Sequence, residues 1–435
     1  MKNFFKTLGP GILFASTAIG VSHLIQCTRA GADYGMALVW AVVVANFFKY
    51  PFFEYASRYA NITKTSIIDG YLSMGKWMLW TYFIITILTM FFVTSAVAVV
   101  TTGFFDNLLG VSEALQSMGF QNTKLVMPVL TFVVCGGILF MGKFSLLDSL
   151  TKIIGSVLLI STLVAYILVL IKGAQPQIPN FVAPDAWDFG NPLTFGFIIA
   201  LMGWMPTAMD LSAWNSLWTL ERIKQTKYHP SLRETQIDFL IGYVISAVLA
   251  ICFITLGAYI MFGTGKNLED NPVKFAHQVV VLFTQSMGDW SYFLIAASSF
   301  TIMFGTLIAV LDGYSRSLER TWTLLNHSSK KATSQKKAFN ISLIILTSVS
   351  FIIMYLFVYS PNSSPKGFKN LVDFATSASF IFAPVIAIVN FKLVSNKQFP
   401  KKHQPKLFLK IVSYLGIAFL IAFSLIKIYY ILGNA

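Results

Sequence analysis

Charged side chains are scarce in this chain of 435 residues. Asp, Glu, Lys and Arg make up 11% of the sequence, whereas soluble globular proteins carry about a quarter. Hydrophobic residues make up 56%, and the mean hydropathy is +0.68. This composition excludes an ordinary soluble domain and predicts an all-α integral membrane protein whose main partner is the lipid bilayer.

Acidic residues are especially few, with 18 Asp and Glu against 32 Lys and Arg, which gives a net charge of +14. A basic chain can bind nucleic acid when its positive charges gather on one folded face. Here the basic residues lie in short loops between apolar runs. We therefore expect no nucleic-acid partner and interpret the charges as a topology signal.

Cysteine and catalytic motifs are also nearly absent. The three cysteines lie within or at the end of apolar runs, and their spacing suggests neither a disulfide framework nor a metal site. The sequence has no GxxxxGK[ST] loop, no HExxH and no Ser-His-Asp signature. These absences predict a protein that is not an enzyme, holds no cofactor and needs no obligatory protein partner.

Long apolar runs are what the chain has in abundance. A helix needs about 20 apolar residues to cross a bilayer. Eleven segments meet this requirement, at residues 8–29, 33–60, 77–104, 124–142, 149–171, 192–220, 237–263, 289–315, 338–359, 369–393 and 407–432. Their short connections predict one transmembrane domain over 1–435, with an amphipathic interfacial helix at 272–287.

The distribution of basic residues predicts the orientation. With the N-terminus in the cytoplasm, the cytoplasmic segments hold 23 Lys and Arg and the external loops hold 7, while Lys49 and Lys427 lie inside spans. The positive-inside rule then predicts a cytoplasmic N-terminus and an external C-terminus. Compact loops without targeting sequences suggest a bacterial-type cytoplasmic (inner) membrane.

Two apolar segments are interrupted near their middle. The first contains "TAIGVSHL" with Gly20, and the sixth contains "MGWMP" with Gly203 and Pro206. Interrupted helices at corresponding positions of two halves are typical of inverted-repeat transporters and mark the central binding site. This predicts a five-plus-five repeat, one half at about 8–171 and the other at about 192–393, followed by an extra helix at about 407–432.

Ionisable side chains inside the spans are candidates for function because they are costly there. His23 is a candidate proton carrier or ligand, or a structural hydrogen-bonding group. Asp210 is a candidate cation ligand or coupling group, with a structural role as the alternative. Lys49 is also a candidate coupling group, and it is deep enough to neutralise Asp210 or Glu54. Glu54 is a further coupling candidate, although its spacing from Arg58 equally predicts a plain i,i+4 ion pair.

The opening of the chain resembles a known family. The stretch "LGPGILFASTAIGVSHLIQCTRAGADYGMALVWAVVVAN", above all its "LGPG", "AGADYG" and "LVW…AN" elements, is similar to the start of natural resistance-associated macrophage protein (Nramp) transporters. Met205 and Pro206 match the Met-Pro of the family's sixth segment. The resemblance implies a LeuT-type inverted repeat with helices 1 and 6 unwound, and proton-coupled uptake of manganese, iron or similar ions.

The resemblance also places the substrate site. The family's metal ligands are an Asp and an Asn in an Asp-Pro-Gly-Asn motif, and that motif falls on Gly20, Val21, Ser22 and His23. The family's methionine ligand falls on Met205, and its later histidine becomes Thr207. The substrate-binding residues implied in this chain are Gly20, Val21, Ser22, His23, Gly203, Met205 and Thr207.

The chain departs from the family at its carboxylate, because Gly20 stands where the Asp is expected. One interpretation is a rearranged metal site of His23, Met205 and Asp210, whose imidazole and thioether suit transition metals. The alternative is a transporter of a small organic solute on the same fold, and a less favoured one is a membrane sensor that transports nothing. In the transporter interpretations, spans 1, 2, 6 and 7 rock against spans 3, 4, 8 and 9.

Overall fold

The structure is a computed structural model and describes residues 7, 9–120, 123–141, 144–173, 181–326 and 332–433, with the side chains of 144–155 and 332–333 excepted. Within these residues the fold is helical, and the one extended pairing is a single bridge between Gly35 and Val182. The apolar runs fold as helices because a helix satisfies every backbone polar group within its own segment.

Each of the eleven predicted segments is a helix or a pair of helix halves. The unbroken ones are α4 (Val39–Thr63), α6 (Lys76–Leu109), α8 (Val126–Phe140), α9 (Phe144–Lys172), α12 (Leu232–Ile260), α14 (Tyr292–Leu325), α15 (Ala332–Met354), α16 (Gly367–Ser395) and α17 (Leu407–Gly433). The broken ones are α2 (Pro10–Ala18), η1 (Ser22–Cys27) and α3 (Thr28–Tyr34), then α10 (Pro192–Gly203), η3 (Met209–Leu211) and α11 (Ser212–Thr226).

Short helices and single turns connect the long ones. They are α5 (Ile67–Ser73), α7 (Val111–Ser117), α13 (Pro272–Met287), η2 (Thr123–Leu125), η4 (Asp289–Ser291), η5 (Tyr355–Tyr359) and η6 (Lys401–His403). The predicted helix at 272–287 is confirmed as α13, and it packs on α6, α9 and α14. Asn271 caps it by accepting hydrogen bonds from the backbone N–H groups of Val273 and Lys274.

Length and composition qualify seven described helices as membrane spans, and the bent pair of α2 with η1–α3 makes an eighth. The remaining three predicted spans fall on α4, α9 and the α10–α11 pair, so the full number of eleven stays a prediction. Large apolar side chains face outward on α15 and α17, such as Ile344, Ile352, Leu425 and Leu432. Such exposed apolar faces are expected where a helix contacts lipid.

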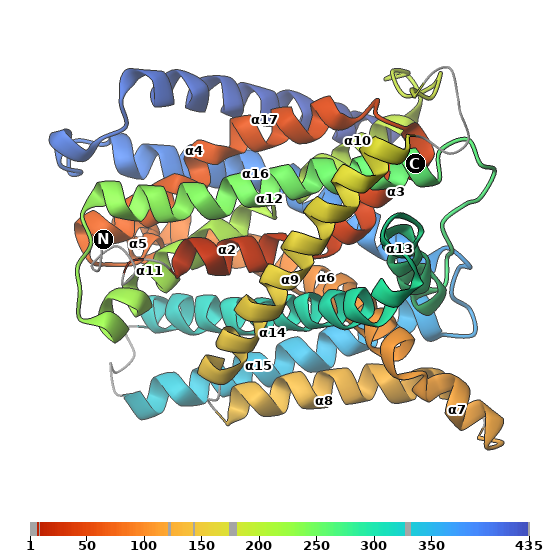
Figure 1. The fold of residues 1–435 in the computed structure, drawn as a ribbon. Coiled ribbons are helices and arrows are strands. Elements are labelled where there is room, and N and C mark those ends of the chain that lie inside the picture. Colours follow the sequence, from red (N-terminus) through yellow and green to blue (C-terminus); the bar gives the residue numbers. More distant parts are fainter. Residues whose placement is uncertain are drawn as a thin grey trace.

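Most of the long helices run side by side, α9 crosses them at a slant, and α2 and α12 lie near the middle of the bundle (Figure 1). α2 begins at the end of the bundle where α5 and α11 lie, and α17 ends at the opposite end, near α3 and α10 (Figure 1). α12 packs against α2, α3 and α4, while α14 packs against α6, α9 and α15. The first broken helix contacts α12 and α14 through α2, and the second contacts α16 through α10 and α4 through α11.

Candidate functional site

The first helix breaks where the glycine interrupts the apolar run. α2 ends at Ala18, and the helix that resumes at Ser22 is bent from it by 44°. Gly20 lies against α14, because a Cβ placed there would be 3.0 Å from Cγ2 of Thr306. The absence of a side chain at Gly20 thus lets α14 approach the break.

The imidazole of His23 is fully buried and bonded at both nitrogens. Nε2 lies 2.9 Å from the carbonyl oxygen of Ser246 in α12, so Nε2 carries a proton and donates it. Nδ1 lies 2.8 Å from Oγ of Ser22, which in turn lies 2.9 Å from the carbonyl oxygen of Ala18. Ser22 has one hydroxyl proton, so it bonds to either Ala18 or a neutral His23, and not to both.

The second break follows α10, which ends at Gly203. A Cβ at Gly203 would collide with the backbone carbonyl of Thr376 in α16, so only glycine allows this close helix contact. Trp204, the next residue, donates its indole N–H to Oγ of Ser379, also in α16, at 2.9 Å. These contacts attach the second break to α16.

Lys49 of α4 reaches this second break. Its Nζ lies 2.6 Å from the carbonyl oxygen of Met202 and 2.8 Å from that of Gly203, and the residue has no exposed surface. Nζ also lies 5.5 Å from the ring centroid of Phe380. Lys49 thus contacts neither Asp210 nor Glu54, the two carboxylates that sequence reasoning offered as its partners.

A pair of sulfur atoms connects the two broken helices. Sγ of Cys27, in η1, lies 4.0 Å from Sδ of Met205, and both residues are fully buried. Sequence reasoning singled out Met205 and found no metal site in the spacing of the three cysteines, of which Cys27 is one. Because Cys27 and Met205 lie far apart in the chain, no sequence pattern indicated this contact.

The Asp210 carboxylate lies between α6 and α14. Its Oδ2 accepts hydrogen bonds from Oγ1 of Thr89 at 2.9 Å and from the hydroxyl of Tyr314 at 3.2 Å. His23, Met205 and Asp210, the predicted metal ligands, therefore each have their own set of partners. Within the described part of the chain, no three His, Cys, Asp or Glu side chains are grouped so as to hold a metal ion.

A small cavity of about 20 Å³ lies between the two breaks, α6 and α14. Three of the predicted binding residues line it, namely Val21, Ser22 and Thr207. Roughly 10–15 Å³ of such space is enough for one water molecule. In this conformation the cavity therefore has room for a water molecule or a single ion, and not for an organic solute.

Glu54, the remaining candidate for coupling, forms an ion pair at one end of α4. Its Oε2 lies 3.0 Å from Nε of Arg58, four residues later, and Gln236 donates to its Oε1 at 2.6 Å. This is the i,i+4 pair that the spacing also predicted. Asp312 and Arg316 form a second pair of the same kind at 2.7 Å.

Both ends of the first broken helix are tied to other elements. Arg29 in α3 forms an ion pair at 2.7 Å with Asp373 in α16. At the opposite end, the Asp238 carboxylate accepts hydrogen bonds from the N–H groups of Gly9 and Gly11, at 3.2 and 2.7 Å. A carboxylate at a helix N-terminus is stabilised by the free N–H groups and by the helix dipole.

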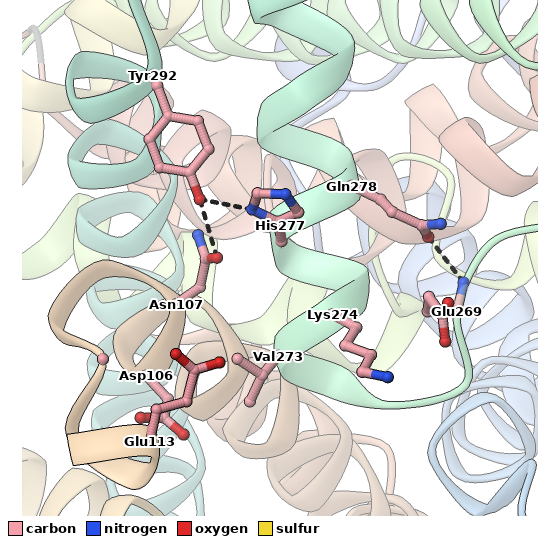
Figure 2. Close-up of a pocket in the computed structure, with 10 residues that line it drawn as sticks. Asp106, Asn107, Glu113, Glu269, Val273, Lys274, His277, Gln278 and Tyr292 are labelled. Carbon is pink, nitrogen blue, oxygen red and sulfur yellow. Dashed lines mark hydrogen bonds between the residues drawn. The ribbon is translucent and has the colours of Figure 1, made fainter. Parts of the chain in front are cut away.

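A larger pocket of about 560 Å³ lies elsewhere, between the end of α6 and the starts of α7, α13 and α14. In Figure 2 the hydroxyl of Tyr292 faces His277 and Asn107, while Asp106 and Glu113 lie together below them. Tyr292 bonds to His277 at 2.7 Å and to Asn107 at 3.1 Å. None of the predicted binding residues lines this pocket, so it is separate from the central site.

Comparison with known proteins identifies the scaffold. The chain matches the family model "Natural resistance-associated macrophage protein-like" over residues 11–430. It is also 33% identical over 431 residues to an uncharacterized protein of Pasteurella multocida (strain Pm70), covering 98% of this chain and 92% of that protein. The chain belongs to the Nramp family. As a member of this transporter family it is not an enzyme.

Solved structures agree on the fold. A mutant of the Eremococcus coleocola manganese transporter superposes with a TM-score of 0.63 at 14% identity, covering 98% of this chain and 86% of that one. MhsT in complex with L-phenylalanine superposes with a TM-score of 0.67 at 13% identity, covering 97% and 98%. This Nramp chain therefore has the LeuT-type fold that the resemblance implied, and it is a multi-pass membrane protein.

Proposed function

We propose that this Nramp chain is a secondary active transporter that takes up a divalent transition-metal ion of the Mn²⁺ or Fe²⁺ class by alternating access, coupled to protons. The central observation is the small cavity between the two helix breaks, which has room for an ion. Membership of the Nramp family and the manganese transporter among the similar structures support the same substrate class. The metal is cargo in this proposal, and no resident cofactor is involved.

The sulfur of Met205 is the metal ligand best supported. It stands where the family's methionine stands, and Cys27 brings a second sulfur to within 4.0 Å of it. Sulfur ligands favour transition metals over Mg²⁺ and Ca²⁺. The Thr207 hydroxyl, which lines the cavity, adds an oxygen donor, and the buried Asp210 of η3 adds a carboxyl group in the same broken helix.

His23 and Ser22 form the best-supported proton site. A neutral His23 and the Ala18 carbonyl compete for the single hydroxyl proton of Ser22. When Nδ1 takes up a proton, it donates to Oγ of Ser22, and the hydroxyl is free to donate to Ala18. Protonation therefore adds one hydrogen bond at the first break, which links the charge of His23 to the helix conformation there.

The packing supports rocking of one bundle against another. The first, second, sixth and seventh segments contact one another through α12 with α2, α3 and α4, and through α11 with α4. The third, fourth, eighth and ninth contact one another through α6, α8, α14 and α15. The Arg29–Asp373 pair joins the first broken helix to α16, outside this first bundle, and would open as that bundle moves.

We further propose a cytoplasmic-membrane location with the N-terminus inside and the C-terminus outside. The excess of Lys and Arg in the predicted cytoplasmic segments supports this orientation. α2 and α17 also begin and end at opposite ends of the bundle, as an odd number of crossings requires (Figure 1).

The test is Mn²⁺ binding and uptake by the purified full chain in proteoliposomes. Met205→Leu removes the sulfur at nearly constant volume, and we expect it to weaken Mn²⁺ binding by about tenfold or more, because even the loss of a group that only orients a metal ligand costs about 10–100-fold in affinity. Met209→Leu is the matched control, a buried methionine of η3 in the same broken helix. A folded wild type that neither binds nor transports a divalent ion would contradict the proposal.

One observation favours a second candidate, a transporter of a small organic solute on the same fold. Gly20 and His23 leave the first break without the carboxylate that a divalent ion would use. A metabolite that raises the unfolding temperature equally with and without a chelator would support this candidate. Mn²⁺ binding that Met205→Leu weakens would exclude it.

A further inference from the structure

The C-terminal end of α10 is a ready-made cation site. The last carbonyl groups of a helix have no intrahelical partner, and they carry the negative end of the helix dipole. In α10 the last two of these groups belong to Met202 and Gly203, where the helix breaks inside the protein. Carbonyl groups at such half-helix ends are known to coordinate monovalent cations in transporters with broken helices.

A side chain of the protein already occupies this position. The Lys49 ammonium lies 2.6 Å from the Met202 oxygen and 2.8 Å from the Gly203 oxygen. The face of the Phe380 ring lies on another side of it, 5.5 Å from Nζ. Two carbonyl oxygens and an aromatic face are the surroundings that stabilise a desolvated cation.

No ion pair accounts for this burial. Among the described residues, no carboxylate pairs with Lys49, and the nearest acidic residue along α4, Glu54, is bonded to Arg58 and Gln236. A buried charge normally needs a partner of opposite sign. Lys49 is held by backbone carbonyl dipoles instead, as a Na⁺ or K⁺ ion bound in a protein would be.

We propose that the Lys49 ammonium is an internal cation that fills a monovalent-cation site at the end of α10, so that this position needs no Na⁺ or K⁺ from solution. The site joins α4 to α10 and, through Phe380, to α16. This cation site is separate from the cavity between the two breaks. The proposal does not depend on which solute is carried. The Nramp assignment leaves Lys49 without a role, so this proposal goes beyond the proposed function.

The experiment removes the ammonium in two ways and supplies cations from solution. Lys49→Ala leaves space beside the carbonyl groups, while Lys49→Met fills much of that space without charge. The unfolding temperature of the purified full chain is measured in equal concentrations of choline, Na⁺ and K⁺ chloride. Lys427→Ala, which removes a lysine of α17 near Gly196 of α10 and away from the helix end, is the control.

For the wild type, Lys49→Met and Lys427→Ala, we expect the unfolding temperature of each protein to be the same in all three salts. Lys49→Ala should unfold at a lower temperature in choline and recover by about 2–4 °C, saturably, in Na⁺ or K⁺. If Lys49→Ala is folded only in Na⁺ or K⁺, that dependence supports the proposal equally.

Two outcomes would overturn the proposal. One is a Lys49→Ala protein that is folded and indifferent to the cation, and the other is a wild type that Na⁺ or K⁺ stabilises as much as it stabilises the variant. If Lys49→Ala folds in no salt, Lys49→Ser repeats the test with a hydroxyl oxygen added to the space. Because the metal proposal is tested with Mn²⁺ and Met205→Leu, either proposal can fail without the other.

Discussion

The polar groups freed at the two helix breaks find their hydrogen-bond partners in different ways. At the first break, the Ala18 carbonyl and Nδ1 of His23 both lie within hydrogen-bond distance of Ser22, a neighbour in the chain, while Nε2 of His23 reaches the Ser246 carbonyl of α12. At the second break, the freed carbonyl groups of α10 bond to Lys49, which comes from a different helix. The freed Ala18 carbonyl at the first break is therefore satisfied by a neighbour in the chain, whereas the freed carbonyl groups at the second depend on the packing of α4 against α10.

The glycines differ in the same way. A Cβ at Gly20 would come nearest to the side chain of Thr306, at 3.0 Å from its Cγ2. A Cβ at Gly203 would meet the backbone of Thr376, which cannot move without shifting α16. The comparison teaches that the first break is adjustable and suits a moving, substrate-binding role, while the second is fixed to its neighbours.

The largest effect is expected from Gly203→Ala. The added methyl group forces α10 away from α16, and such overpacking against backbone should cost more than about 3 kcal/mol. We expect little or no folded protein, measured as the loss of the monodisperse peak in size-exclusion chromatography.

Two alanine variants serve as controls for Gly203→Ala. Gly196→Ala lies on the same helix and meets only the flexible end of Lys427 at 3.1 Å, so it should be tolerated. The stability of Gly20→Ala should lie between the stabilities of Gly196→Ala and Gly203→Ala. A Gly203→Ala protein as stable as Gly196→Ala would show that the second break is no more rigid than the first.

A smaller effect is expected when the missing carboxylate is restored at the first break. Gly20→Asp with His23→Asn recreates two family ligands, but the new Cβ lies within 3.0 Å of Cγ2 of Thr306. Adding Thr306→Ser removes that methyl group and keeps the hydroxyl that bonds to the Ser16 carbonyl. We expect the triple variant to bind Mn²⁺ at least about tenfold more tightly than the wild type, a gain of roughly 1.4 kcal/mol.

Isothermal titration calorimetry with Mn²⁺ measures this gain in affinity. The unfolding temperature measures the strain that the new side chain at position 20 causes against Thr306. The double variant without Thr306→Ser should be less stable than the triple variant. Unchanged Mn²⁺ affinity in a folded triple variant would mean that the first break differs from the family site in more than its two ligands.

Much of the architecture was predictable from sequence because apolar runs and glycine breaks are local signals. The positions of all eleven helical segments, both interruptions and the helix at 272–287 follow from such runs. The assignment of Val21, Ser22 and Thr207 to one cavity was also within reach, since the family alignment places them there.

The contacts that decide the site were out of reach because they join residues distant in the chain. Cys27 meets Met205 across 178 positions, and His23 meets Ser246 across 223. Lys49 was expected to face a carboxylate, since buried charges usually pair. Its partners are backbone carbonyl groups, which every residue has, so no residue type in the sequence indicates them.

The smallest effect is expected from Ser22→Ala, and it probes how local the first break is. The change removes a hydroxyl that bonds to Ala18 or His23, at a cost of about 1 kcal/mol. Thr17→Ala is the matched control, because the Thr17 hydroxyl donates to the carbonyl of Leu13, four residues earlier, and has no histidine partner. Chemical denaturation in detergent measures both losses.

The informative quantity is the coupling of each hydroxyl to His23→Phe in a double-mutant cycle. If Ser22 and His23 act as one hydrogen-bonded unit, their effects should fall short of additivity by about 0.5 kcal/mol or more. Thr17→Ala should be additive with His23→Phe within error. Additivity of Ser22→Ala as well would mean that Ser22 serves the Ala18 carbonyl alone, and the first break would then lack the proton-linked hydrogen bond that distinguishes it from the second.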